Sequence, residues 1–159
     1  MKLIEPNVEI IPQGEGLLGV YKQIEVAGRT CYKSEDKISV DSSKEFVQRM
    51  INSGHTAMLE HGTVYLAIPI TTHYSGAGSI YSEYPTYCRV NESEGFKFRD
   101  IFGDPVDCWC VTTNLRFIAE HDLWQDVKEL SCEPTKYHEK RVTVRFTCDR
   151  GVSHKRFVA

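Results

Sequence analysis

The chain has 159 residues, with 19 basic and 22 acidic side chains, a formal net charge of −3 and no long run of either sign. This balance excludes an overall basic field for nucleic acid or a membrane surface, so a small anionic ligand would need a local pocket. The length suits one domain, residues 1–159, that buries a conventional core. No stretch approaches the roughly 20 apolar residues of a membrane span or resembles a signal peptide, so we expect a cytoplasmic protein with no membrane partner.

The first half of the chain predicts one strand and two helices. Loose alternation of apolar residues from 2 to 12 predicts the strand. A helix from about 15 to 27, ending toward Gly28, is predicted by helical spacing of Leu17, Leu18, Tyr21 and Ile24. The second helix runs from a cap at Asp41, Ser42 or Ser43 to Gly54, and its apolar stripe consists of Phe46, Val47 and Met50.

In the second half, β-branched and apolar content predicts strands at 63–70, 106–111 and 142–146, and apolar periodicity predicts helices at 113–121 and 123–130. The segment 71–103 is rich in Gly, Ser, Tyr and Asn, which indicates loop and short strand. Within it, Gly76-Ala77-Gly78-Ser79 matches only the start of a dinucleotide fingerprint, because Tyr81 stands where a third glycine is needed. We interpret those four residues as a flexible loop. The whole pattern favours one mixed α+β or α/β domain.

Six cysteines are scattered without a CxxC pair, which predicts free, reduced thiols rather than a disulfide framework or a metal site: Cys31, Cys88, Cys108, Cys110, Cys132 and Cys148. Two of them, in the run CWC at 108–110, share one face of a predicted strand, and we expect them in the core. Cys31 follows Arg29, whose guanidinium would favour a thiolate, so a nucleophile is an alternative interpretation of this residue.

Two histidines and a glutamate fall within the run GHTAMLEH, residues 54–61, between a predicted helix and a predicted strand. A metal site is disfavoured because His55 and His61 would diverge by about 120° on a helix, whereas an HxxEH pair stays within about 40°. In a second interpretation, a tight turn presents His55, Thr56 and Glu60 to a ligand or to exposed backbone amides. In a third, purely structural interpretation, His55 caps the preceding helix and Glu60 pairs with a surface base.

Three segments, in this order, resemble the flavin-dependent thymidylate synthases: AGRTCY at 27–32, SGHTAMLEH at 53–61, and VRF at 144–146 leading into DRGVSH at 149–154. The resemblance covers nearly the whole chain, and the block from about 81 to 141 resembles the long insertion of one branch of that family. It implies a mixed α/β fold assembled as a homotetramer, with FAD and dUMP bound where subunits meet.

The family's reaction, a step of nucleotide biosynthesis, is the reductive methylation of dUMP to dTMP. NADPH reduces FAD, and methylenetetrahydrofolate supplies the one-carbon unit. This methyltransferase reaction uses no protein cysteine as nucleophile, so the resemblance names no catalytic residue here and argues against Cys31 as one. It implies cofactor-binding roles for His55, Ala57 and Glu60, whose positions approach the flavin in the family. It also implies one for Cys31, which stands where a small polar residue often contacts FAD.

The chain departs from the family pattern after DRGVSH. In the family that helix continues into an Arg-His-Arg triplet, followed by a serine, and these groups hold the flavin and the nucleotide phosphate. Here Val158 and Ala159 stand where arginine and histidine are expected. Losing two or three guanidinium contacts with a phosphate weakens dUMP binding by about 10³-fold or more. We therefore expect feeble dUMP binding and no dTMP formation by this chain alone, with residual FAD binding through the His55 region.

Two other functions stay open at this point. One is a non-catalytic, oligomerising or flavin-binding remnant of the same family, which pairs with a complete subunit that supplies the missing arginines. The other is an unrelated cysteine-rich metal or redox protein, which metal analysis of the purified chain would reveal.

Overall fold

The computed structural model describes residues 5–70, 77–93, 97–99 and 103–148, and it is a mixed α/β structure with antiparallel sheets. The chain divides into two units: Gln13–Arg141 is one, and the other joins residues 1–12 with residues 142–159. In the described part of the chain, no helix is both long enough and apolar enough to cross a membrane.

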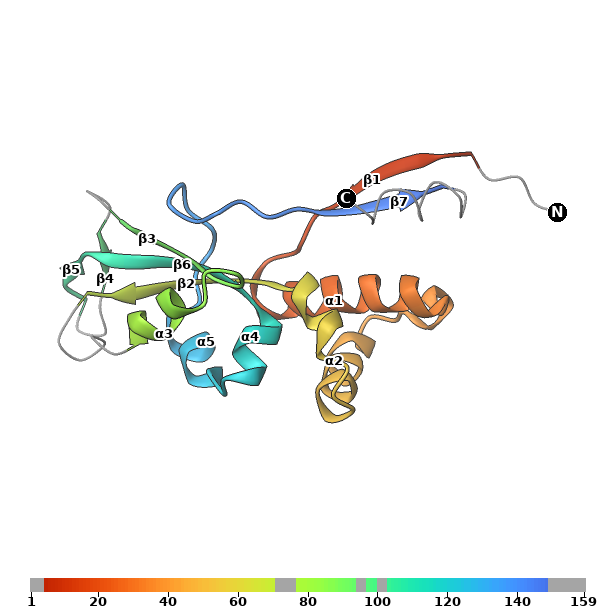
Figure 1. Ribbon diagram of the computed structural model, residues 1–159, viewed down its shortest axis with the longest axis horizontal. Coiled ribbons are helices and arrows are strands. Elements are labelled where there is room, and N and C mark those ends of the chain that lie inside the picture. Colours follow the sequence, from red (N-terminus) through yellow and green to blue (C-terminus); the bar gives the residue numbers. More distant parts are fainter. Residues whose placement is uncertain (1–4, 71–76, 94–96, 100–102, 149–159) are drawn as a thin grey trace. The chain divides into compact units, whose positions relative to one another are not determined.

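A three-stranded sheet in the order β2–β6–β3 organises the larger unit, and its strands are β2 (Thr63–Pro69), β6 (Cys108–Asn114) and β3 (Arg89–Glu92). Leu66 lies opposite Val111, and Val111 lies opposite Val90. Leu66 and Val111 point into the hydrophobic core. Three short helices lie along this face of the sheet (Figure 1): α3 (Ala77–Glu83), α4 (Leu115–Glu120) and α5 (Trp124–Leu130).

The opposite face of the sheet carries small and polar side chains, which alternate with the core residues. Ala67, Cys110 and Thr112 are buried there. Residues 132–141, which we call the strap, cover this face. The side-chain amide of Asn91 donates to the carbonyl of Tyr137 at 2.8 Å, and the backbone N–H of Glu139 donates to Thr112 Oγ1 at 2.9 Å. The expectation that both cysteines of the CWC run are buried is therefore confirmed.

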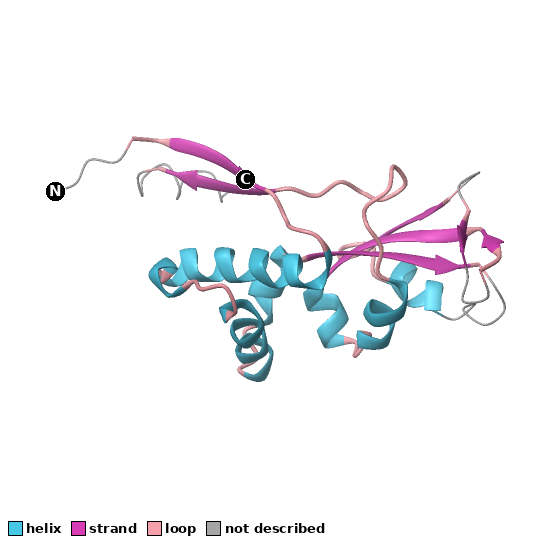
Figure 2. Cartoon of the chain, turned by 180° about the vertical axis from the view of Figure 1, so that it is seen from behind, coloured by secondary structure: helices cyan, strands magenta, loops and turns pink. Residues whose placement is uncertain are grey.

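Helix α1 (Gly16–Tyr32) extends beyond the end that the sequence predicts at Gly28. Gly28 does not end the helix because it lies inside the contact with α2 (Ser42–Asn52), which Figure 2 shows crossing α1. A Cβ at Gly28 would come within 2.6 Å of Cζ of Phe46. The glycine thus permits close approach of the two helices. Helix α1 ends instead at Tyr32, and Lys33, whose φ of 51° is left-handed, caps it.

The predicted end of α2 at Gly54 is confirmed. Gly54 has a φ of +72°, its N–H donates to the carbonyl of Ile51, and the N–H of His55 donates to the carbonyl of Met50. This is the Schellman pattern that closes helices at a left-handed glycine. The 3-10 helix η2 (Thr56–His61) follows directly and leads into β2. The short 3-10 helix η1 (Glu35–Lys37) lies between α1 and α2.

The smaller unit contains an antiparallel ribbon of β1 (Asn7–Ile11) and β7 (Thr143–Thr147). Val8 pairs with Phe146, and Ile10 pairs with Val144. A second two-stranded sheet, of β4 (Phe98–Arg99) and β5 (Pro105–Val106), belongs to the larger unit.

Most predicted elements are confirmed, with two corrections. Helix α3 lies where loop and short strand were expected, so the interpretation of Ala77, Gly78 and Ser79 as a flexible loop is wrong, and Gly76 lies outside the described residues. Strand β6 continues to Asn114, beyond the predicted start of the next helix at 113, because Thr112 and Thr113 pair with β2. The side chain of Asn114 then accepts the N–H of Phe117 and caps α4.

Candidate functional site

The end of α1 and the start of η2 meet at the GHTAMLEH segment. The hydroxyl of Tyr32 lies 3.3 Å from Nδ1 of His55, and both side chains are exposed. His55 occupies the N-cap position of η2, while its backbone N–H closes α2. The backbone of His55 therefore has the structural role considered from sequence, and its imidazole projects from the junction of the three helices.

Two other residues that the resemblance singled out are exposed on the same elements. Cys31 precedes Tyr32 in the last turn of α1, and Ala57 lies in the first turn of η2. Arg29 gives the nucleophile interpretation of Cys31 no support, because Nε of Arg29 donates at 2.8 Å to Oε1 of Glu25 in the helix interior. Cys31, His55 and Ala57 are thus all exposed, on two elements that the contact between Tyr32 and His55 joins.

Glu60, at the other end of η2, takes part in an ion-pair network with α4. One terminal nitrogen of Arg116 lies 2.6 Å from Oε1 of Glu60, and Nε of Arg116 lies 2.7 Å from Oε1 of Glu120. Thr56 donates its hydroxyl to the same oxygen of Glu120 at 2.9 Å. Glu60 is therefore paired with a surface base, as the structural interpretation predicted.

Hydrogen bonds favour the charged forms of Arg116 and Glu120 in this network. The hydrogen bond from Arg116, and a weaker one from Thr56, lower the pKa of Glu120 below its usual value. The pKa of Arg116 is raised by its hydrogen bonds to Glu120 and Glu60. At neutral pH Arg116 and Glu120 are therefore charged, and the network ties η2 to α4 while His55 stays exposed.

Metal binding finds no support in the described residues, which contain no group of three or more His, Cys, Asp or Glu side chains arranged to hold an ion. None of the six cysteines forms a disulfide. The segment 149–159, with the positions Val158 and Ala159, lies outside the described residues.

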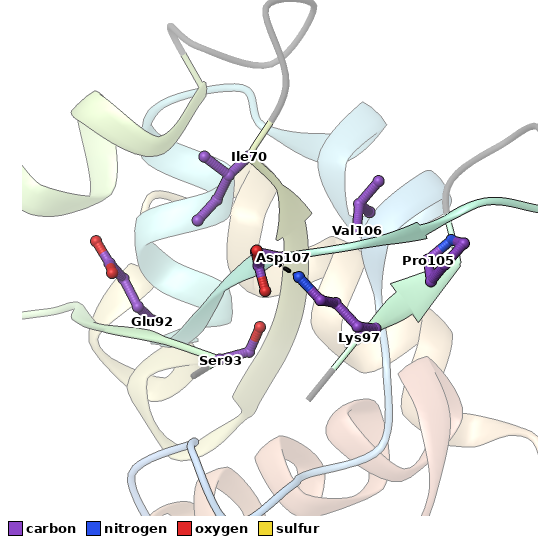
Figure 3. Close-up of a pocket in the computed structure, with 7 residues that line it drawn as sticks. All are labelled: Ile70, Glu92, Ser93, Lys97, Pro105, Val106 and Asp107. Atoms are coloured by element: carbon purple, nitrogen blue, oxygen red, sulfur yellow. Dashed lines mark ion pairs between the residues drawn. The ribbon is translucent and has the colours of Figure 1, made fainter. Parts of the chain in front are cut away.

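An open pocket of about 660 Å³ lies elsewhere, near the ends of β3 and β5. Figure 3 shows Lys97 and Asp107 pointing toward each other there, with Nζ and Oδ2 2.6 Å apart. The pocket is lined by Ile70, Glu92, Ser93, Lys97, Pro105, Val106 and Asp107, so it contains none of the residues singled out from sequence. Lys97 and Asp107 neutralise each other, and nothing in the pocket corresponds to a family motif.

Sequence reasoning missed Tyr32 and Arg116 as neighbours of the site. The spacing of Arg116 and Glu120, four residues apart on a helix, was available as a signal of an ion pair. The contacts of Arg116 with Glu60 and of Tyr32 with His55 join distant parts of the chain and have no local signal.

No family model, curated protein or solved structure matches this chain.

Proposed function

We propose that this chain is a flavin-dependent thymidylate synthase-like protein in which the end of α1 and the start of η2 form part of an FAD-binding surface. The observation that carries the proposal is the exposure of His55, Ala57 and Cys31 on these two adjoining elements. A residue that binds a cofactor must be accessible to it, and all three meet this condition.

The side chains present fit one wall of a cofactor site. Within the described residues, His55 has a partner at Nδ1 only, so Nε2 remains available to a ligand. Ala57 lets a planar ring approach the backbone closely, and the Cys31 thiol is a weak hydrogen-bond donor. The surface is open rather than enclosed, so in this proposal a second copy of the chain supplies the opposite wall.

In this proposal, the protein binds and orients while the cofactor reacts. A bound flavin supplies the hydride chemistry of the family reaction, in which NADPH and methylenetetrahydrofolate serve the reductive methylation of dUMP to dTMP. His55 hydrogen-bonds the cofactor, and Glu60 acts through Arg116 to hold η2 in place. Glu60 is thus a positioning residue, which revises the direct contact that the resemblance implies.

FAD titration of the purified chain, followed by quenching of flavin fluorescence, tests the proposal. We expect His55→Ala to weaken FAD binding by about 3- to 10-fold, because one hydrogen bond contributes roughly 0.5–1.5 kcal/mol. His61→Ala is the matched control, since His61 is also exposed and lies at the far end of η2. Absence of FAD binding by the wild-type chain, or equal loss in both variants, would contradict the proposal.

Formation of dTMP from dUMP, with both cosubstrates and added FAD, separates two forms of the proposal. A chain that binds FAD and forms dTMP is an enzyme of this type. A chain that binds FAD without forming dTMP is the flavin-binding alternative.

A further inference from the structure

The strap, residues 132–141, is held on the sheet by polar contacts rather than by the hydrophobic core. In the described part of the chain, no strap residue belongs to that core or to the partly buried apolar residues packed against it. Its anchors are hydrogen bonds and ion pairs, among them the bonds from Asn91 to Tyr137 and from Glu139 to Thr112. A segment held in this way can leave the sheet while the core stays packed, because local opening breaks only the contacts of that segment.

His138 is the buried anchor of the strap, with an exposed fraction of 8%. Its Nδ1 accepts the backbone N–H of Thr135 at 3.0 Å, and its Nε2 donates to the carbonyl oxygen of Leu66 in β2 at 3.1 Å. Both bonds require the neutral ring with its proton on Nε2. His138 therefore joins the strap to the sheet and, through Thr135, fixes the turn of the strap.

Two cysteines of the larger unit are buried on opposite faces of the sheet. A side-chain hydrogen bond joins Thr135 of the strap to Cys110, which is fully buried in β6. Cys88 belongs instead to the hydrophobic core, with Sγ 3.2 Å from Oγ1 of Thr113. Because side chains alternate along β6, Thr113 and Cys110 point to opposite faces. The strap therefore covers the Cys110 thiol, whereas the core covers the Cys88 thiol.

The titratable groups that contact the His138 ring carry no charge at neutral pH. They are Cys132 of the strap, with Sγ 3.8 Å from Nε2, and Tyr65 of β2, with the ring centres 5.3 Å apart. Burial raises the pKa of both groups, to about 12 for Cys132. From β6 and β3, the side chains that contact the strap are the neutral Cys110, Thr112 and Asn91.

The charged side chains of the strap do not compensate a charge on His138. They are Glu133, Lys136, Glu139, Lys140 and Arg141. Glu139 pairs with Arg141 and with Arg89 of β3, and the other three residues are exposed. The pKa of His138 is lowered by burial, and only the Leu66 carbonyl acts in the opposite direction. A protonated ring at this place is therefore a buried charge without a counter-ion.

Protonation also breaks the hydrogen bond that fixes the turn of the strap. The new proton is on Nδ1, where it opposes the backbone N–H of Thr135. Oγ1 of Thr135, 3.0 Å away, can accept the new N–H, but the backbone N–H of Thr135 then has no acceptor. Water solvates both the charged ring and this N–H once the strap has left the sheet.

We propose that the strap is a latch operated by protonation of His138: the neutral ring holds residues 132–141 on the sheet, and the protonated ring releases them and uncovers Cys110. Release begins as the pH falls below about 6.5, because the open strap binds the proton more tightly than the closed strap does. Each unit by which the pKa of the closed form lies below that of the open form raises the open population by up to about tenfold. The latch involves neither α1 nor η2, so it is independent of the proposed flavin surface.

Labelling of the full chain with dithiodipyridine, which reacts with thiols in mildly acidic as well as neutral solution, tests the latch. Peptide mass spectrometry gives the rate at each cysteine between about pH 8 and pH 5, and division by the rate at the exposed Cys31 removes the pH dependence of the reagent. We expect the ratio for Cys110 to rise at least about tenfold toward pH 5, and the ratio for Cys88 to stay constant. A constant ratio for Cys110 overturns the latch. A parallel rise at Cys88 overturns local release, because the core then opens as well.

His138→Gln and His121→Gln are the matched variants. His121 ends α4 and stacks on Tyr84 and Phe117, away from the strap. Glutamine takes up no proton in this pH range, so the Cys110 ratio should lose its pH dependence in His138→Gln, whatever its absolute level, and keep it in His121→Gln. A dependence that persists in His138→Gln, or that disappears in both variants, overturns the inference. If His138→Gln does not fold, the comparison of Cys110 with Cys88 in the wild type decides by itself.

Discussion

Two arginine–glutamate pairs in the larger unit have nearly the same geometry and opposite environments. Nε of Arg29 lies 2.8 Å from Glu25, and the two side chains are 9% and 1% exposed. Arg116 lies 2.6 Å from Glu60, and those side chains are 28% and 45% exposed. Water screens the exposed pair of Arg116 and Glu60 but not the buried pair of Arg29 and Glu25. The buried pair is therefore required for stability, whereas the exposed pair is a weak surface contact.

The buried pair is embedded in the α1–α2 contact. Oε1 of Glu25 accepts from Arg29, and Oε2 accepts from the Ser42 hydroxyl at 2.9 Å. The guanidinium carbon of Arg29 lies 5.0 Å from the centre of the Phe46 ring. Glu25, Arg29 and Phe46 are all buried, so the pair itself is not presented to a ligand at the surface. The exposed pair, by contrast, leaves the start of η2 accessible, which is the condition for a binding role of His55.

The largest effect is expected from Glu25→Ala. Removing one partner of a buried ion pair leaves the Arg29 guanidinium uncompensated, and we expect the free energy of unfolding to fall by about 3–5 kcal/mol. Urea denaturation at neutral pH measures it. A double variant, Glu25→Met with Arg29→Met, should be less destabilised than the single variant, since no unpaired charge remains. A loss below about 1 kcal/mol in Glu25→Ala would show that burial does not distinguish the two pairs.

His138, in the strap, extends the comparison to a buried neutral group. Nδ1 of His138 accepts the N–H of Thr135 at 3.0 Å, and Nε2 lies 3.1 Å from the carbonyl oxygen of Leu66, so the partners assign a neutral ring with its proton on Nε2. Cys132 Sγ is 3.8 Å from Nε2. Replacing His138 by Gln should lower the free energy of unfolding by about 1–3 kcal/mol at neutral pH, because buried partners lose their hydrogen bonds. Urea denaturation again measures the change.

The same histidine predicts a pH dependence. Burial lowers the pKa of His138 from its usual value of 6.5, and the bond to Leu66 offsets this only in part. The unfolded chain therefore binds the proton more readily, and stability falls as the pH drops below about 6.5, levelling off below the pKa of the folded protein. Urea midpoints between about pH 8 and pH 5 should show this slope in the wild type and a smaller one in His138→Gln. An equal slope in both proteins would assign the dependence to other groups.

Gly28→Ala should have a smaller effect. The new Cβ would meet Cζ of Phe46 at 2.6 Å, and overpacking costs about 1–3 kcal/mol, while alanine in a helix regains up to about 1 kcal/mol relative to glycine. We expect a net loss of about 1 kcal/mol by thermal or urea unfolding. In a protein that already carries Phe46→Leu, Gly28→Ala should lower the free energy of unfolding by less than it does in the wild type. A stabilised single variant would show that Gly28 is not a contact residue.

The smallest effect is expected from Arg116→Ala. The pairs with Glu60 and Glu120 are exposed, so the free energy of unfolding should change by little more than the error of the measurement, and less at high salt. Glu120→Gln, which removes one charge of the same network, serves as the control. A loss comparable to that of Glu25→Ala would contradict the distinction drawn between the two pairs.

Local elements could be predicted because their signals are local. The stripe of α2 and its end at Gly54 follow from helical spacing and from the preference of glycine for positive φ, and both are confirmed. Helix α3 could not be predicted, since its Gly- and Ser-rich start has low helix propensity. Its anchor is a distant one: Tyr81 is fully buried and donates its hydroxyl to Asp126 at 2.8 Å.

The candidate site could be predicted in part. The motif at 54–61 located His55 and Ala57 at an accessible junction, and it gave the surface pairing of Glu60 as one alternative. The identity of that partner, Arg116, depends on packing of α4 beside η2 and has no signal within either segment. The apolar face of the ribbon was equally hidden, because the strands at 2–12 and 142–146 were both predicted but their pairing has no local signal.

Hydrogen exchange of the full chain with and without FAD tests the central claim most directly, because it reports where the ligand binds. The account predicts that FAD slows exchange in the peptides covering residues 29–33 and 54–58, and leaves the β3 and β5 peptides near the other pocket unchanged. Protection confined to β3 and β5, or no protection at FAD concentrations that saturate binding, would contradict the assignment of a flavin surface to α1 and η2.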